Sequence, residues 1–298
     1  MGKIIVTGAS GFIGSNVAQF LADEGFDVVS SDIRPSPRPT GSWRAADLTR
    51  PEDLVSLTQG AEAVCHIGGI GDVYVATKDP ALAMHVNGCA TSYLLEAART
   101  NGVQRVVYAS SWEVYGPPRY QPIDENHPTA ATHPYNISKL AGDLLVQSAG
   151  RHGPMRTVAL RLGTAYGPGI RDNAVIPLFV RKARKKEPIE IQGTGTQYRQ
   201  FTHVTDIARA FALALRSPDP GPVYNVVSPE QTTIRGLAET IVSHIPTEII
   251  YREGRVGDPP PAIIDASRIR KELGWEAKVA LSAGLASFIE NYAAKPTP

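Results

Sequence analysis

Three side chains that could move a proton at an alcohol carbon lie near one another in the sequence. Tyr135 and Lys139 are four residues apart, so on a helix they lie on one face, a turn from each other. A free phenol has a pKa of about 10, which a nearby ammonium lowers. Ser111, at the end of an expected strand, could hold the reacting oxygen beside Tyr135. These residues predict a site that removes a hydroxyl proton while a hydride leaves the same carbon.

The N-terminal segment predicts the element that would hold a hydride acceptor. Residues 3–7 form a short, β-branched apolar run, typical of a parallel strand buried on both faces. Gly8, Gly11 and Gly14 follow it directly, and residues 15–22 have helical spacing. Between a strand and a helix, such glycines permit a tight turn and let the helix N-terminus approach a pyrophosphate. This segment therefore predicts a dinucleotide site.

Asp32 indicates which dinucleotide binds. It ends the second expected strand, residues 27–31, and lies eighteen residues beyond Gly14. A carboxylate there can accept hydrogen bonds from the ribose hydroxyls and would repel a 2′-phosphate, whereas Arg34 nearby could accommodate that phosphate. On balance the pattern favours NAD over NADP.

Strand-like and helical segments alternate as far as Leu162, and short elements with proline-rich joints follow. This alternation predicts an α/β protein with a Rossmann-like, doubly wound parallel sheet and a smaller C-terminal α/β substrate-binding domain. We expect an NAD-binding domain over residues 1–165, to which residues 202–220 return. The substrate-binding domain would comprise residues 166–201 and 221–298.

Composition narrows the class of protein. The 298 residues carry 30 basic and 29 acidic side chains, so no overall field favours nucleic acid or an anionic membrane. The two cysteines, Cys65 and Cys89, are too few for a disulfide framework, and no apolar run is long enough to span a bilayer. The seven histidines lack metal-ligand spacing, so we expect no metal. We predict a cytoplasmic globular protein.

Two further polar residues attract attention. Asp72 either faces the substrate or caps the segment that follows it. Asn87 lies in the apolar middle of a long helix expected over residues 81–100, so it needs a buried partner.

Taken together, these motifs resemble the extended short-chain dehydrogenase/reductase family, in its NAD-dependent epimerase/dehydratase branch acting on nucleotide sugars. The resemblance covers essentially the whole chain. Its marks are Thr7-Gly8-Ala9-Ser10-Gly11-Phe12-Ile13-Gly14, Asp32, Asp47-Leu48, His66 with Gly68-Gly69, Val86-Asn87-Gly88, Ala109 to Gly116, Tyr135 to Lys139, Arg161 with Tyr166 to Gly169, Gln197 to Phe201, Arg255 with Gly257-Asp258, and Leu273-Gly274-Trp275.

This resemblance implies a role for each residue that matches the family's motifs. Ser111, four residues before Tyr115, would position the sugar hydroxyl, Tyr135 would act as base and then acid, and Lys139 would lower the tyrosine pKa and hold the nicotinamide ribose. The implied NAD contacts are Gly8, Gly11, Phe12, Ile13, Gly14, Asp32, Asp47, Leu48, Gly68, Gly69, Asn87, Tyr135 and Lys139. The implied substrate contacts are Ser111, Glu113, Asn173, Arg199 and Arg255.

The chain departs from the family's pattern at Trp112. Similar dehydratases have an acid there, paired with the glutamate that this chain has at Glu113. The resemblance therefore implies an NAD-dependent 4-epimerase of a nucleotide sugar, of the UDP-glucose/UDP-galactose type. The alternatives are a 4,6-dehydratase or UDP-glucuronate decarboxylase-like enzyme using Glu113, and a non-catalytic NAD(P)-sensing regulator. Helices over 81–100 and 134–151 pair in this family, so we expect a homodimer.

Overall fold

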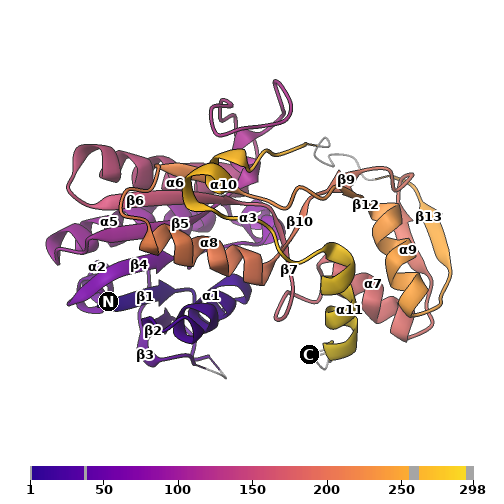
Figure 1. Ribbon diagram of the computed structural model, residues 1–298, viewed down its shortest axis with the longest axis horizontal. Helices are drawn as coiled ribbons and strands as arrows, with labels where there is room; N and C mark the ends of the chain where they lie inside the picture. The colour runs from indigo at the N-terminus through magenta and orange to yellow at the C-terminus, as the bar shows by residue number, and fades with distance from the viewer. Residues whose placement is uncertain (1, 37–38, 255–261, 293–298) are drawn as a thin grey trace.

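A seven-stranded parallel sheet forms the larger part of the molecule (Figure 1). The computed structural model describes residues 2–36, 39–254 and 262–292; Arg255, an expected substrate contact, lies outside them. The strand order is β11-β6-β5-β4-β1-β2-β3, and each neighbouring pair is parallel. The strands are β1 (Lys3–Thr7), β2 (Asp27–Asp32), β3 (Ser42–Ala45), β4 (Ala61–His66), β5 (Arg105–Ser111), β6 (Arg156–Leu162) and β11 (Val223–Val226).

Helices cover both faces of this sheet. On one face α1 (Phe12–Asp23) and α8 (Val204–Arg216) bury Val17, Leu21 and Phe211 against the strands. The opposite face packs against α2 (Pro51–Thr58), α5 (Ala90–Thr100) and α6 (Pro134–His152). The predicted doubly wound α/β fold is confirmed.

The strand order reverses between β1 and β4, where the loops that follow both strands meet. Gly8, with φ of +68°, turns the chain after β1, and a Cβ there would lie 2.6 Å from the Cα of Gly68. A Cβ on Gly14 would lie 2.1 Å from the Gly8 carbonyl oxygen. Only glycine fits at these two positions. In open parallel sheets such a reversal point is where ligands bind.

The long helix expected over residues 81–100 is present, with one π-helical turn in its middle. It comprises α4 (Pro80–Met84), a π-helical turn over His85–Cys89, and α5. The π-helical turn contains Asn87, whose side chain accepts from the Ile70 amide at 2.8 Å and donates to the Ile70 carbonyl at 3.0 Å and to Ser138 Oγ at 2.9 Å. The expected buried partner of Asn87 is thus confirmed, and it fixes the loop after β4.

A smaller unit with its own apolar core lies to one side of the sheet, at the right of Figure 1. Its elements are α7 (Val175–Arg184), β8 (Ile189–Gln192), α9 (Ile234–His244), β13 (Ile249–Arg252) and α11 (Leu281–Asn291). Strands β8 and β13 pair in parallel. Shorter elements join the two units: β7 (Thr164–Tyr166), β9 (Tyr198–Arg199), β10 (Phe201–His203) and β12 (Thr232–Thr233).

One expected domain boundary is wrong. The segment 221–298 does not belong wholly to the smaller unit, because β11 pairs with β6 at the edge of the large sheet. Helix α10 (Ser267–Leu273) also packs on the large sheet, where Ile269 and Trp275 enter its core. A strand of four residues is too short for a periodic pattern that would indicate which sheet it joins.

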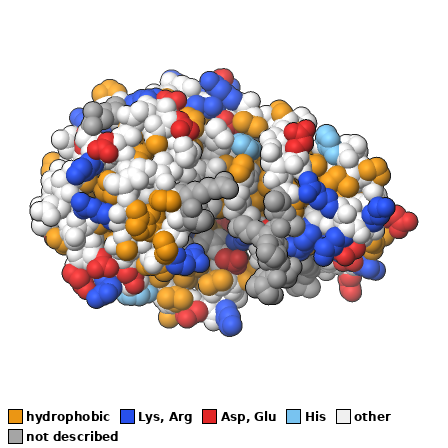
Figure 2. Space-filling view, turned by 90° about the horizontal axis from the view of Figure 1, so that it is seen from below, with side chains coloured by type: hydrophobic (Ala, Val, Ile, Leu, Met, Phe, Trp, Pro, Cys, Tyr) orange, Lys and Arg blue, Asp and Glu red, His pale blue; other side chains and the backbone are white. Residues whose placement is uncertain are grey.

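Charged side chains of both signs are interspersed over the face seen in Figure 2, as the near-balanced composition predicts. Among the described helices, none combines the length and apolar character needed to cross a membrane.

Candidate active site

A cleft of about 940 Å³ opens at the carboxyl end of the strands, between the sheet and the smaller unit. Almost all the predicted site residues line it: Gly8, Gly11, Phe12, Ile13, Gly14, Asp32, Asp47, Leu48, Gly68, Gly69, Ser111, Glu113, Tyr135, Lys139, Asn173 and Arg199. Asn87 does not, because its side chain is 2% exposed beneath the cleft and bonded to Ile70 and Ser138. It positions the lining rather than forming part of it.

The half of the cleft beside β1 and β2 fits a dinucleotide. Helix α1 begins at Phe12 after Gly11, and in the described structure no side chain caps its first turn. Its first amides can therefore donate to a pyrophosphate. Asp32 accepts from the Ser10 amide (N–Oδ2 3.2 Å) and the Arg34 amide (N–Oδ1 3.2 Å), which hold its carboxylate at the end of β2. These residues suit the phosphates and the ribose of NAD.

The loops after β3 and β4 complete this half. Asp47 accepts from the Thr49 amide at 2.9 Å and the Thr49 hydroxyl at 2.7 Å, which fixes the turn that carries Leu48. Thr7 Oγ1 accepts from the amide of Gly68 at 3.0 Å, tying the loop after β4 to the end of β1. A Cβ on Gly68 would lie 2.7 Å from Leu48 Cδ1, so a larger residue would disturb this wall.

The three predicted catalytic residues come together on the opposite wall. Ser111 ends β5, and Tyr135 and Lys139 lie on α6, whose first turn His133 caps. Ser111 lies near enough to the Tyr135 phenol to lower its pKa. Lys139 is 6% exposed, and its Nζ lies 4.3 Å from the centroid of the Tyr108 ring. The arrangement presents one phenol, one hydroxyl and one ammonium to the same side of the cleft.

The protein around Tyr135 does not lower its pKa as expected. Burial of the hydroxyl raises the pKa above its ordinary value of 10 and the charge of Glu113 adds to this, whereas Ser111 and Arg171 oppose it. Burial also lowers the pKa of Lys139 to about 7, against the opposing effect of Asp143. The prediction of a lowered phenol pKa is wrong for this structure, because desolvation outweighs the effects of Ser111 and Arg171.

A buried ion pair beneath these residues was not predicted. Asp143 accepts from Arg161 twice, at 3.1 Å each, and from the hydroxyl of Ser110 at 2.5 Å. The two charged side chains are 0% and 4% exposed. Asp143 lies one turn after Lys139 on α6, while Arg161 lies on β6 and Ser110 on β5. A carboxylate four residues after Lys139, on a helix face that must be buried, is the signal that could have revealed the pair.

Arg171 is a second residue that the sequence did not single out. It lines the cleft, pairs with Asp72 at 3.2 Å (Nη1–Oδ2), and bears electrostatically on both Tyr135 and Glu113. Asp72 also caps α3 (Val73–Lys78) by accepting from the Tyr74 amide at 2.8 Å. Of the two roles considered for Asp72, the structure shows the cap.

Trp112 and Glu113 follow Ser111 in a short 3₁₀ turn, η2 (Trp112–Tyr115). Both line the cleft. Burial raises the pKa of Glu113, and the charges of Arg199 and Arg171 oppose this shift. Glu113 is thus a carboxyl group inside the cleft that holds its proton more firmly than usual. Its neighbour is an indole, whose N–H can donate a hydrogen bond but cannot deliver a proton at neutral pH.

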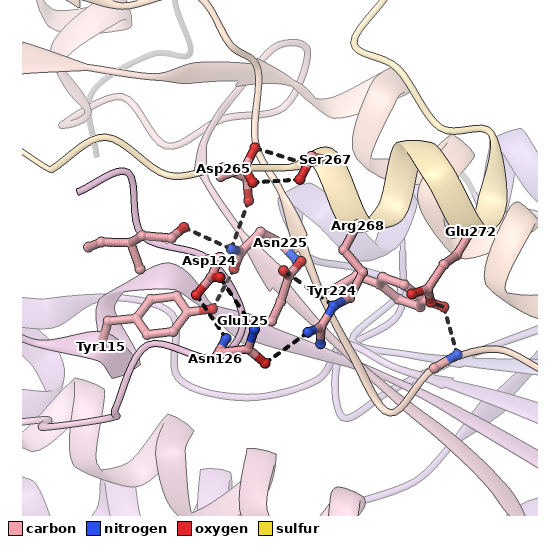
Figure 3. A network of polar contacts seen from close by, with 12 residues as sticks. Tyr115, Asp124, Glu125, Asn126, Tyr224, Asn225, Asp265, Ser267, Arg268 and Glu272 are labelled. Carbon is pink, nitrogen blue, oxygen red and sulfur yellow. Dashed lines mark hydrogen bonds and ion pairs between the residues drawn. The ribbon is translucent and has the colours of Figure 1, made fainter. Parts of the chain in front are cut away.

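A polar network anchors the end of this turn from behind (Figure 3). The Tyr115 hydroxyl donates to Asn225 Oδ1 at 2.7 Å, and the amide of Asn225 donates to Glu125 Oε1 at 2.8 Å. Arg268, from α10, pairs with Glu125 at 3.6 Å. The Arg161 guanidinium carbon lies 4.7 Å from the centroid of the Tyr115 ring. Contacts from β11, α10 and β6 therefore hold the turn that carries Trp112.

Among residues 2–36, 39–254 and 262–292 there is no cluster of three or more histidine, cysteine, aspartate or glutamate side chains able to hold a metal ion.

Comparison with known proteins agrees with this description. Residues 4–227 match the model of a family described as the NAD dependent epimerase/dehydratase family. A putative UDP-glucose 4-epimerase of Methanocaldococcus jannaschii is 30% identical over 295 residues, covering 95% of both chains. A dTDP-glucose 4,6-dehydratase of Streptomyces niveus is 30% identical, covering 97% of this chain and 92% of that protein. The solved structure of MoeE5 with UDP-glucuronic acid and NAD is 33% identical, with a TM-score of 0.89 over 97% of this chain and 98% of that one.

Proposed function

The chain belongs to the NAD-dependent epimerase/dehydratase family, and we propose that it interconverts the C4 epimers of a UDP-hexose through a transient 4-keto sugar. The observation that supports this most is the joint presence of Ser111, Tyr135 and Lys139 on one wall of the cleft, facing the dinucleotide half. The similarity to UDP-glucose 4-epimerases over nearly the whole chain supports the choice of substrate class.

NAD, when bound, supplies the acceptor for the hydride that leaves C4 and the donor that returns it. Tyr135, as the phenolate, takes the proton of the C4 hydroxyl as the hydride leaves, and as the phenol it gives this proton back when the ketone is reduced on its other face. Ser111 holds the reacting oxygen and, by lowering the pKa of Tyr135, favours the phenolate against the effect of burial. Lys139, on the same helix face, adds a positive charge when it is protonated.

Polar side chains on the smaller unit's side of the cleft would bind the substrate. Arg199, on β9, donates to the carbonyl of Tyr198 at 2.9 Å, which leaves the rest of its guanidinium fork available to a diphosphate. Asn173 lines the same part of the cleft. Replacing Arg199 by alanine would weaken UDP-sugar binding and leave NAD retention unchanged, whereas the matched variant Arg252→Ala, outside the cleft lining, would change neither.

A 4,6-dehydratase is the second candidate, because Glu113 lies in the cleft with a raised pKa. Elimination needs a base for the C5 proton and an acid for the departing C6 hydroxyl. Glu113 could serve one of these roles, but Trp112 cannot serve the other. The position of Trp112 therefore favours epimerisation over elimination.

The deciding experiment follows a deuterium label at C5 of UDP-glucose and of UDP-galactose by NMR. Epimerisation gives the C4 epimer, retains the label and accumulates no 4-keto-6-deoxy sugar. Washout of deuterium, abolished in Glu113→Gln, would establish the dehydratase instead. UDP-glucuronic acid belongs in the panel, since MoeE5 binds it. A non-catalytic NAD(P)-sensing regulator would show no transient absorbance of reduced nicotinamide with any UDP-sugar.

We also propose a cytoplasmic homodimer. The cysteines Cys65 and Cys89 are both free thiols, as in proteins of a reducing compartment. Helix α6 exposes Leu144 (52%) and Leu145 (37%) to solvent, and a second copy of this chain could cover this apolar face. Light scattering is expected to give twice the chain mass, and the mass of one chain in Leu144→Glu.

A further inference from the structure

We propose that Tyr108 is a positioning residue for the reaction, because its aromatic ring holds the ammonium of Lys139 in place and in its charged form. Tyr108 itself is 1% exposed and does not line the cleft, so it acts only through Lys139. The inference deepens the proposed function by explaining how a buried lysine stays charged beside the reacting tyrosine. It rests on that function only in its second readout, which is turnover.

The first support is the contact between the two side chains. Lys139 lines the cleft from α6, and Tyr108 lies beneath it on β5, the strand on which this helix packs. The Lys139 Nζ lies over the ring, 4.3 Å from its centroid. A cation within about 6 Å of a ring centroid is attracted by the negative face of the ring, most strongly where water is excluded. Lys139 is 6% exposed, so this condition is met.

The second support is the charge balance around the ammonium. Burial lowers the pKa of Lys139 to about 7, so its positive charge is easily lost near neutral pH. Asp143, one turn later on α6, opposes this shift, but its oxygens are engaged in the buried ion pair described above. His66, on β4, is neutral because burial lowers its pKa to about 3. Tyr135, one turn earlier, attracts the ammonium only as the phenolate. The face of the Tyr108 ring adds an attraction at the ammonium itself.

The third support is the way in which the chain makes room for the ring. A Cβ on Gly142 would lie 2.4 Å from the Tyr108 hydroxyl oxygen and 2.8 Å from its Cζ, so α6 passes over the ring at a residue without a side chain. Glycine is unfavourable inside a helix, and the space needed by the ring accounts for it here. The imidazole of His66 also packs against the ring, with centroids 5.5 Å apart. The ring is therefore a fixed surface for the ammonium.

The first experiment changes the electrons of the ring and keeps its shape. Tyr108→Phe is compared with variants that carry 3,5-difluorophenylalanine or pentafluorophenylalanine at position 108, because fluorine withdraws charge from the ring face. The pKa of Lys139 is measured by NMR from its Cε resonance in NAD-saturated protein labelled with ¹³C-lysine. This resonance is identified by its loss in Lys139→Met. The pKa should be unaltered in Tyr108→Phe and should fall stepwise with fluorination, by about 1 in all.

The second experiment measures turnover of UDP-glucose in Tyr108→Leu, which removes the aromatic face. If the pKa of Lys139 falls from about 7 to about 6, its charged fraction falls by about 10-fold at pH 8 and by less than about 2-fold at pH 5. The decrease in kcat should follow this difference, whereas Tyr108→Phe should keep the native pH profile. A variant that had only lost packing would show the same decrease at both pH values.

Tyr224→Leu is the matched control, because it removes another buried tyrosine of the same sheet, on β11, from the core of the opposite face. It should leave the pKa of Lys139 unchanged. The proposal is overturned if this pKa is the same with phenylalanine and with pentafluorophenylalanine at position 108, or if it falls equally in the control. Absence of turnover with every UDP-hexose would overturn the proposed function instead, since the NMR titration reports on Tyr108 without any reaction.

Discussion

Replacing Asp143 by alanine tests how strongly the buried ion pair holds the catalytic wall together. The carboxylate is 0% exposed and accepts from Ser110, Gln147 and, twice, Arg161. It thereby joins α6, which carries Tyr135 and Lys139, to the ends of β5 and β6. The alanine variant would leave the guanidinium of Arg161, 4% exposed, without a counter-charge in the core.

Breaking a buried pair by removing one partner costs about 3–5 kcal/mol. The free energy of unfolding, measured by urea titration, is expected to fall by this amount in Asp143→Ala. Glu96→Ala is the matched control, since it removes one partner of the exposed pair with Arg99, whose side chains are 63% and 64% exposed. An exposed pair contributes about 0–1 kcal/mol. A loss in Asp143→Ala no greater than in the control would refute the argument.

Three further predictions concern the site. Tyr135→Phe should lower kcat by about 10²–10⁴-fold with little change in UDP-sugar binding, and near-normal turnover would place the base elsewhere. Asp32→Ala should reduce the preference for NAD over NADP in equilibrium binding, which would stay the same if Asp32 does not meet the ribose. Burial lowers the pKa of His66 from 6.5 to about 3, so the unfolded chain binds that proton more readily and stability falls as pH falls between these values. Native protein should therefore lose more unfolding free energy from pH 7 to pH 5 than His66→Gln, and equal losses would contradict this.

The parts of the site that could be predicted depend on contacts close in sequence. Gly8, Gly11 and Gly14 form one turn, and Tyr135 and Lys139 form one helical turn, so spacing alone determines their relation. Asp32 was placed by the length of a single strand–turn–helix–strand unit. In each case the local backbone geometry is nearly the same in any protein with that pattern, and the structure places all six residues on the cleft lining.

The parts that could not be predicted depend on packing between distant elements. Asp143 meets Arg161 only because α6 lies across β6, and Arg171 meets Asp72 only because the smaller unit folds back over the sheet. Desolvation by that same packing reversed the expected pKa shift of Tyr135.

The amino-acid sequence by itself determined the fold class, the dinucleotide turn and the identity of the reacting groups, because these follow from residue type and short-range periodicity. Only the tertiary structure decided the burial of those groups, the ion pair beneath them, the membership of β11 in the large sheet, and the place of Trp112 on the lining of the cleft. Each of these depends on which surfaces exclude water from one another, and that is a property of the assembled chain rather than of any segment of it.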